Sequence, residues 1–225
     1  DGITAGEGDM ILAGDNLEAL LLISGALVQV RSNNTQGDDD VIAVGDGDQV
    51  ILGGTGADAV SAGVGAHDVI GDNGEFTYTN GNLTTIAATN SVDGAGDSVT
   101  LGLGDHRLVL GIGGDTLVAG DGRTLLLGDN GTVVLQEDGT VVSLTGATTA
   151  NDGSDSVTLG DGNVDALLGD GADTFTMGDG NAVLVGDGGA INYYLSGILA
   201  SVTATAGTGG NDVVTIGDGN VTALL

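Results

Sequence analysis

The chain lacks cysteine, proline, lysine and tryptophan, and aromatic residues make up only 2% of its 225 residues. Without cysteine, neither a disulfide scaffold nor a thiolate metal site can form. Only three arginines oppose the acidic residues, so the formal net charge is −29. This charge excludes nucleic acid and anionic membranes as partners, because the electrostatic contribution to binding would be repulsive.

Long apolar runs are also missing. The longest stretch, residues 19–28, is interrupted by Ser24 and Gly25 and is too short to cross a bilayer, so no membrane insertion is expected. High charge with few aromatics is compatible with a disordered chain. The regular recurrence of apolar residues favours a folded chain instead.

Glycine and aspartate are abundant. There are 45 glycines, and 28 of the 32 acidic residues are aspartates. Many aspartates stand between glycines, as in residues 45–47, 160–162 and 178–180. Short carboxylates on tight turns suit a hard cation such as Ca²⁺.

The arrangement of these residues shows that the chain is a tandem repeat. Asp40, Asp97, Asp155 and Asp212 open nearly identical phrases, such as DSVTLGLGD and DSVTLGDGN, at spacings of 57, 58 and 57 residues. We therefore divide the chain into a partial repeat 1–39, repeats 40–96, 97–154 and 155–211, and a partial repeat 212–225. Both termini fall in mid-repeat and in phase, which suggests a window from a longer array.

Each repeat contains shorter units of nine residues. In the third copy these are 155–163, 164–172, 173–181 and 182–189, followed by a longer segment. Apolar residues recur two apart within each unit, as in Val157 and Leu159. A two-residue period places such pairs on one face of a strand, pointing inward.

The units resemble the RTX nonapeptide GGxGxDxUx, which residues 53–60 (GGTGADAV) match outright. Residues 169–175 match from the second position, with Leu168 in place of the first glycine, and residues 207–212 match more loosely. The resemblance implies an all-β fold: a parallel β-roll, or β-solenoid, with two strands per coil. It also implies calcium as the bound cofactor.

The family's ligand aspartate precedes the strand in the first and third unit of every copy. These candidate calcium ligands are Asp40, Asp58, Asp97, Asp115, Asp155, Asp173 and Asp212, together with Asp170 of the same type of turn. In the second and fourth units other residues stand there, including His67 and His106, which we interpret as tolerated turn residues. The opposite edge still offers the turn carboxylates Asp46, Asp121, Asp161, Asp179 and Asp218 as further candidates.

Two physical interpretations of these aspartates remain open. Stacked carboxylates about 4.8 Å apart repel one another unless a cation binds between the turns, which favours calcium. Alternatively, the aspartates only stabilise turns through hydrogen bonds to the backbone.

The remaining segment of each copy is predicted to be a β-hairpin, which makes a hairpin insertion every 57 or so residues. Its turns are expected at Ser24-Gly25, Asn80-Gly81, Asp138-Gly139 and Ser196-Gly197. The second and fourth units also carry an outward apolar stripe: Leu52, Val109, Leu127, Leu167 and Val185. Either the hairpins or a neighbouring chain must cover this stripe.

No nucleophile, base or carboxylate pair stands apart from the repeat, so an enzyme active site is not expected. The resemblance favours an extracellular structural or adhesive segment of a giant secreted surface or matrix fibre, which self-associates. The alternatives are a calcium-triggered folding and secretion module of a larger enzyme or toxin, and a solenoid whose Ser/Thr face binds ice or glycans.

Overall fold

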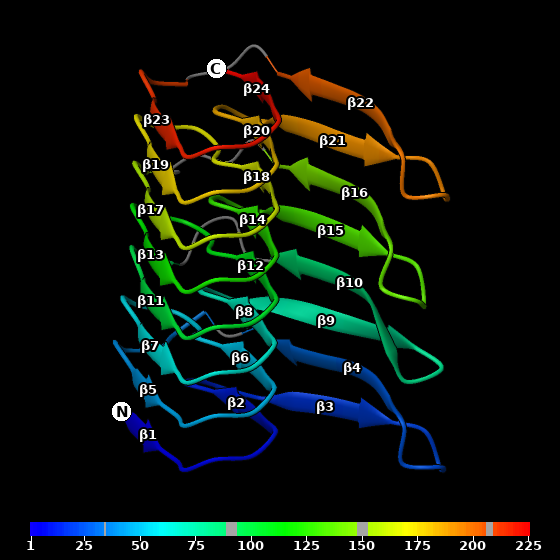
Figure 1. The fold of residues 1–225 in the computed structure, drawn as a ribbon. Helices are drawn as coiled ribbons and strands as arrows, with labels where there is room; N and C mark the ends of the chain where they lie inside the picture. The colour runs from blue at the N-terminus through cyan, green and yellow to red at the C-terminus, as the bar shows by residue number, and fades with distance from the viewer. Residues whose placement is uncertain (34, 89–93, 148–152, 206–208) are drawn as a thin grey trace.

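The structure is a computed structural model, and it describes residues 1–33, 35–88, 94–147, 153–205 and 209–225. In these residues the secondary structure is entirely β, with strands arranged as three stacked columns (Figure 1). The expectation of an all-β solenoid is confirmed. Two columns form the roll, and the third is a sheet of hairpins beside it.

The first column, sheet A, contains eight parallel strands in register. In spatial order they are β1 (Gly2–Thr4), β5 (Val41–Ala43), β7 (Ala59–Ala62), β11 (Ser98–Leu101), β13 (Thr116–Ala119), β17 (Ser156–Leu159), β19 (Thr174–Met177) and β23 (Val213–Ile216).

The second column, sheet B, is parallel in the same way. It contains β2 (Met10–Ala13), β6 (Gln49–Leu52), β8 (His67–Ile70), β12 (His106–Val109), β14 (Thr124–Leu127), β18 (Val164–Leu167), β20 (Ala182–Val185) and β24 (Val221–Leu224).

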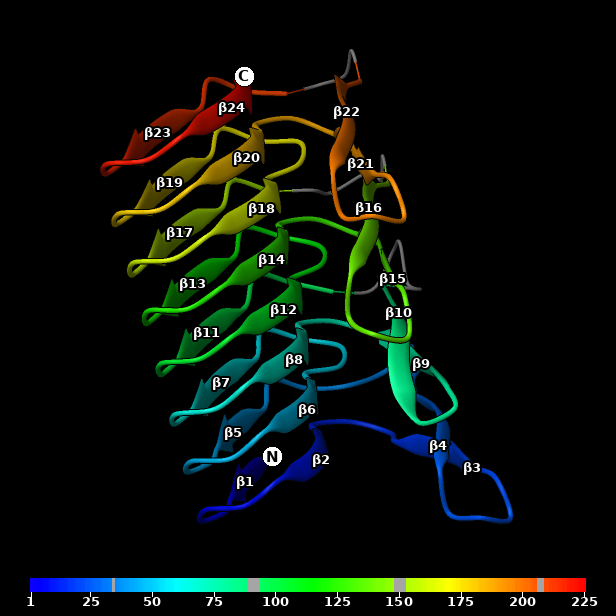
Figure 2. The same ribbon diagram turned by 45° about the vertical axis from the view of Figure 1, so that its right-hand side comes forward.

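The third column, the hairpin sheet, is antiparallel. Its strands follow the order β22 (Leu199–Ala204), β21 (Gly189–Tyr193), β16 (Val141–Gly146), β15 (Gly131–Leu135), β10 (Asn82–Ala88), β9 (Gly74–Thr79), β4 (Leu27–Ser32) and β3 (Glu18–Leu21). Consecutive hairpins pair with each other, as β10 does with β15, so one continuous sheet runs beside the roll (Figure 2).

One coil of the roll consists of a strand in sheet A and a strand in sheet B. Four-residue turns such as 160–163 lead from sheet A to sheet B, and we call this side the turn edge. The return edge leads from sheet B back to sheet A. Its connections alternate between six residues, as in 53–58, and a long segment that contains a hairpin, as in 71–97.

The turns bring successive coils into close backbone contact. A side chain at Gly162 would collide with the carbonyl oxygen of Gly122 in the neighbouring coil, and the φ of Gly162 is 155°. Glycine is therefore required at this position by both space and backbone conformation. This contact explains why the repeat conserves glycine spacing along the turn edge from copy to copy within the chain.

The roll interior is filled by the residues that the two-residue period predicts. In β17, Val157 and Leu159 are buried whereas Ser156 and Thr158 are exposed. Phe175 and Leu184 belong to the same interior cluster between sheets A and B. The prediction that the paired apolar residues point inward is confirmed.

A second core lies between the outer face of sheet B and the hairpin sheet. The apolar stripe is buried there against residues such as Phe76, Ile86 and Val133. Leu52 and Val109, for example, have no exposed surface. The hairpins of the same chain therefore cover the stripe.

The hairpin turns lie where the sequence places them. Gly25, Gly81, Gly139 and Gly197 have positive φ values between 77° and 86°. In three of the turns the glycine amide donates to the carbonyl oxygen three residues earlier, as from Gly139 to Gln136 at 2.9 Å.

His67 and His106 are not turn residues, and that interpretation is wrong. They are the first residues of β8 and β12, where 0% and 1% of their surface is exposed. Their rings stack at 5.1 Å, and each Nε2 contacts a carbonyl oxygen four residues earlier, Gly63 for His67 and Gly102 for His106. They fill the roll interior at the turn edge.

A substitution in the second core tests the packing of the hairpins on sheet B. Phe76→Ala should destabilise the fold by about 3–5 kcal/mol, because it empties a fully buried site between sheet B and the hairpins. Thermal and denaturant unfolding monitored by circular dichroism would measure this loss. Leu195→Ala at an exposed hairpin tip is the control, and an equal loss there would contradict the assigned packing.

Candidate metal-binding site

The strand-entry aspartates form a single column along the return edge. Asp40, Asp58, Asp97, Asp115, Asp155 and Asp173 are all buried, with 1% to 4% of their surface exposed, and Asp212 is half-buried. The structure thus brings together seven of the predicted ligands, each immediately before a strand of sheet A.

Backbone hydrogen bonds connect this column. From Asp58 to Asp212, the Oδ1 atom of each carboxylate accepts the amide of the preceding aspartate in the column, from Asp40 N to Asp58 Oδ1 at 2.8 Å up to Asp173 N to Asp212 Oδ1 at 3.1 Å. The Oδ1 atom of Asp40 instead pairs with the N-terminal ammonium of Asp1 at 2.6 Å. One oxygen of each carboxylate from Asp58 to Asp212 therefore makes the backbone hydrogen bond that the turn interpretation expects.

The second carboxylate oxygen, Oδ2, has no such hydrogen bond in four of these aspartates. For Asp58, Asp97, Asp115 and Asp173, Oδ2 is buried and has no hydrogen-bond partner among the described residues. A buried carboxylate oxygen without a partner is costly, because water has been removed and nothing replaces it.

Main-chain carbonyl oxygens lie close to these Oδ2 atoms. A Cβ at Gly53 would overlap both Asp58 Oδ2 and the carbonyl oxygen of Gly71. At Gly71, the overlapping atoms would be Asp97 Oδ2 and the carbonyl oxygen of Leu110. Carboxylate and carbonyl oxygens converge only because glycine has no side chain there. This donor set has the chemistry that Ca²⁺ prefers.

A second row of carboxylates on this edge escaped the sequence analysis. Asp15, Asp72, Asp129 and Asp187 follow the sheet B strands where the hairpin segments begin. Asp15 accepts the amide of Thr55 at 2.7 Å, and Asp129 accepts that of Asp170 at 2.6 Å. The signal was available, because Gly-Asp-Asn recurs at residues 14–16, 71–73 and 128–130, at the spacing of the repeat.

The two rows raise the proton affinity of this edge. Burial, followed by neighbouring carboxylates, raises the pKa of Asp97 to about 9 and that of Asp115 to about 10. Burial likewise raises the pKa of Asp72 to about 8. The pKa of Asp58 rises to about 6 and that of Asp173 to about 7, again mainly through burial.

Cationic side chains do not offset this charge. The three arginines form ion pairs elsewhere: Arg31 with Glu18, Arg107 with Asp68 and Arg123 with Asp165. These pairs involve the hairpin sheet and the face of sheet B that looks toward it. A buried carboxylate column without arginine needs protons or a metal ion as its counter-charge.

The carboxylates of the turn edge are arranged differently. Asp46, Asp121, Asp161, Asp179 and Asp218 lie on the turns between sheets A and B, as predicted. All five are exposed, and several link neighbouring coils, as when Asp179 Oδ1 accepts the Asp218 amide at 2.7 Å. Solvent reaches these carboxylates, unlike those of the column at the return edge.

The described residues contain no group of three or more His, Cys, Asp or Glu side chains in metal-binding geometry. An ion at the return edge would therefore depend on one or two carboxylates supplemented by carbonyl oxygens. The same portion of the chain contains no helix long and apolar enough to cross a membrane.

Comparison with protein-family models, curated proteins and solved structures finds no match to this chain.

The raised pKa values predict how stability depends on pH in chelator. Between the ordinary value of 3.8 and the raised values, the folded chain binds more protons than the unfolded chain. The free energy of unfolding should therefore fall as pH rises, and the melting temperature should decrease between pH 7 and 9.5. Burial lowers the pKa of His106 from 6.5, so its opposing effect is confined to lower pH.

Differential scanning calorimetry in chelator across this pH range would measure the decrease. A melting temperature that is constant or that rises with pH would contradict the assigned burial of the carboxylates.

Proposed function

We propose that the chain is a calcium-stabilised extracellular structural and adhesive β-solenoid, a segment of a surface or matrix fibre, and that Ca²⁺ binds along its return edge. One observation carries this proposal: buried carboxylates such as Asp97 and Asp115 have an oxygen without a hydrogen-bond partner and no arginine nearby. The resemblance of residues 53–60 to the RTX nonapeptide supports calcium as the cation.

Calcium suits these positions for two reasons. It takes six to eight oxygen ligands in flexible geometry, so it accepts the mixture of Asp58 Oδ2 and main-chain carbonyl oxygens. It also neutralises two rows of carboxylates that would otherwise need protons. Because these sites exist only in the folded chain, the free energy of ion binding contributes to folding.

The repeat geometry supports a fibre. All three sheets share one axis, and each repeat adds two coils and one hairpin in register. The edge strands β3 and β22 can pair with further strands as β4 pairs with β9. Association or continuation of copies along this axis is therefore part of the proposal. A calcium-triggered secretion module does not need a second, longer period with a covering hairpin.

Calcium should raise the thermal stability and the β-structure content of the chain. At pH 7.5, millimolar calcium should raise the melting temperature above that in EGTA, because the ion replaces the protons of the buried column. Circular dichroism and isothermal titration calorimetry would measure the effect. An unchanged β spectrum and melting temperature after exhaustive EGTA treatment would refute the calcium proposal.

Aspartate substitutions at the return edge and at the turn edge should affect calcium binding unequally. Asp115→Asn keeps an Oδ1 acceptor for the Asp97 amide but removes the ionisable group. At pH 8 in EGTA this variant should be as stable as the unmodified chain or more stable, whereas in calcium it should gain less stability and bind fewer ions.

Asp179→Asn on the exposed turn edge is the matched control. It should change neither the stability gained in calcium nor the number of bound ions appreciably. Equal losses of bound calcium in the two variants would show that the turn edge binds ions as strongly as the return edge.

A further inference from the structure

The outer face of sheet A is open to solvent. In each strand the outward side chains alternate with those that point into the roll, so that Thr100 and Thr158 are exposed whereas Val99 and Val157 are buried. Sheet B differs, because the hairpin sheet lies over its outer face (Figure 2). Among the described residues, the hairpins therefore cover one of the two large faces of the roll and leave the other open.

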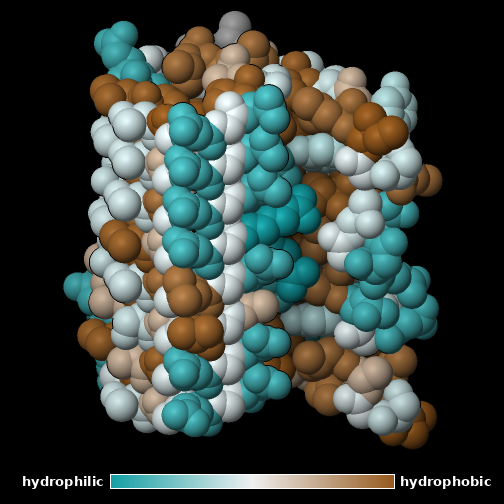
Figure 3. All heavy atoms as spheres, viewed as in Figure 1, coloured by the Kyte–Doolittle hydropathy of each residue, from teal (hydrophilic) through white to brown (hydrophobic). Residues whose placement is uncertain are grey.

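No charged side chain lies on this open face, although the net charge of the chain is −29. The outward residues are the first and third of every strand of sheet A, and each is Gly, Ala, Ser, Thr or Val. Three of them, Val41, Val118 and Val213, are 43% to 58% exposed. In Figure 3 this face is seen edge-on along the left of the molecule, where pale and brown atoms stand beside a teal column of the turn edge.

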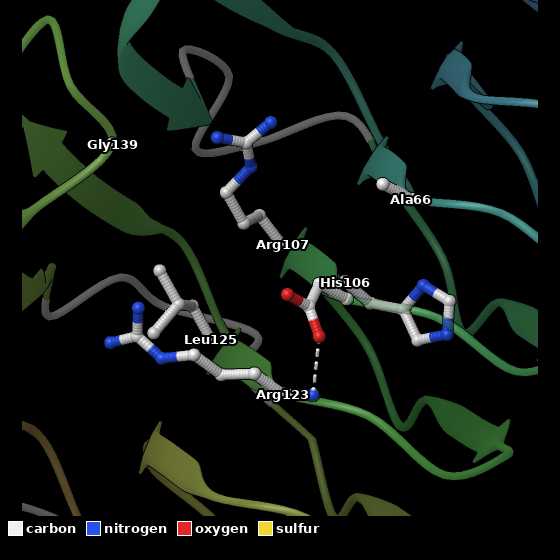
Figure 4. A pocket seen from close by; sticks show the side chains of 7 residues that line it. Ala66, His106, Arg107, Arg123, Leu125 and Gly139 are labelled. Atoms are coloured by element: carbon white, nitrogen blue, oxygen red, sulfur yellow. Dashed lines mark hydrogen bonds between the residues drawn. The ribbon is translucent and has the colours of Figure 1, made fainter.

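Strand propensity does not explain the missing charges. The outward positions of sheet B, which lie beneath the hairpins, include Asp68, Arg107 and Asp165. Figure 4 shows Arg107 extending, together with Arg123, toward the hairpin loop that carries Gly139. Strands of this chain thus accept charged residues at outward positions even where a second sheet lies over them. The more exposed of the two faces has none.

We propose that the outer face of sheet A binds the same face of a second copy of the chain. Two copies that each carry a net charge of −29 repel one another wherever their carboxylates meet. The turn edge presents exposed aspartates such as Asp161 and Asp179, and the return edge holds two rows of carboxylates. The outer face of sheet A brings no charge into the contact. It also offers no counter-charge to a cationic or an anionic partner, which disfavours both.

The side chains on this face suit the packing of one sheet on another. The parallel register aligns outward residues in columns, as Thr116 with Ser156 and Val118 with Thr158. Two sheets with small side chains can approach to about 10 Å, so that facing columns interdigitate. Methyl groups of Thr and Val then lose contact with water, while facing hydroxyls donate to and accept from one another. A contact between identical faces is isologous, so it closes at two copies.

The size of the face determines the strength of the contact. The strands of this eight-stranded sheet lie about 4.8 Å apart and four residues extend about 13 Å, so each copy contributes roughly 500 Å². The total of roughly 1,000 Å² is at the lower limit for a specific interface. We expect a reversible dimer with a Kd between about 10 µM and 1 mM.

This proposal rests on the proposed fibre and specifies how copies lie beside one another, whereas pairing through β3 and β22 joins them end to end. The test therefore uses protein in calcium whose bound ions and melting temperature have been measured. A chain that binds no calcium is then distinguished from one that binds calcium but does not associate.

Sedimentation equilibrium of the full chain in calcium, from about 10 µM to about 1 mM, measures the association. The unmodified chain should pass reversibly from monomer to dimer over this range. Thr100→Glu combined with Thr158→Glu should raise the Kd about tenfold or more, because these carboxylates would be buried against those of the second copy. A chain that stays monomeric at about 1 mM overturns the proposal and leaves this face to the ice or glycan that the sequence also allows.

Asn163→Asp combined with Asn220→Asp is the matched control. It adds the same negative charge at exposed positions of the turn edge, and its Kd should equal that of the unmodified chain. Equal weakening in both double variants would show that net charge governs the association. An unchanged Kd in the glutamate variant would place the contact elsewhere, and either result overturns the proposal.

A single introduced cysteine locates the contact, because the chain has none of its own. Thr100→Cys lies on β11, in the middle of sheet A, and a short bismaleimide should cross-link this variant into dimers. Leu195→Cys is the control at a hairpin tip, where Leu195 is 72% exposed, and it should cross-link little. Cross-linking through Leu195→Cys that equals or exceeds that through Thr100→Cys would contradict the face-to-face contact.

Discussion

The whole architecture depends on how a column of aspartates is buried at the return edge without cationic side chains. One oxygen of each carboxylate accepts a backbone amide and thereby fixes the register of successive coils. The other oxygen is enclosed together with carbonyl oxygens, as at Gly53 and Gly71. A carboxylate in that position is stable only when protonated or bound to a metal ion, so the stability of the fold is linked to one of these two processes.

The hairpins make this burial possible. Sheet B would otherwise expose Leu52, Val109 and their equivalents, and the hairpin sheet covers these residues from β6 to β20. One hairpin of two strands serves two coils, which explains why the repeat is about 57 residues long whereas one coil needs only 18. The alternation of short and long returns along the return edge follows from the same arrangement.

The sequence predicted the features that follow from the repeat spacing, but not those that depend on how coils and hairpins pack against one another. Spacing alone located the strands, the hairpin turns and the strand-entry column headed by Asp40, because the repeat imposes register. It did not reveal that Asp72 and His67 are buried, since their enclosure arises from neighbouring coils and hairpins. Two residues at equivalent distances from glycine therefore differ in role: Asp97 is enclosed, whereas Asp179 remains in contact with solvent.

Arg107 and Arg123 distinguish the two ends of the sheet B strands. Arg107 and Arg123 pair with Asp68 and Asp165 on the face of sheet B that looks toward the hairpins. The return edge lies at the other end of the same strands and receives none of this positive charge. Apart from the Asp1 ammonium that pairs with Asp40, its counter-charge must come from the solvent, as protons or as a cation. The hairpin-facing side of sheet B is therefore held by ion pairs within the chain, whereas the return edge depends on protons or ions from the solvent.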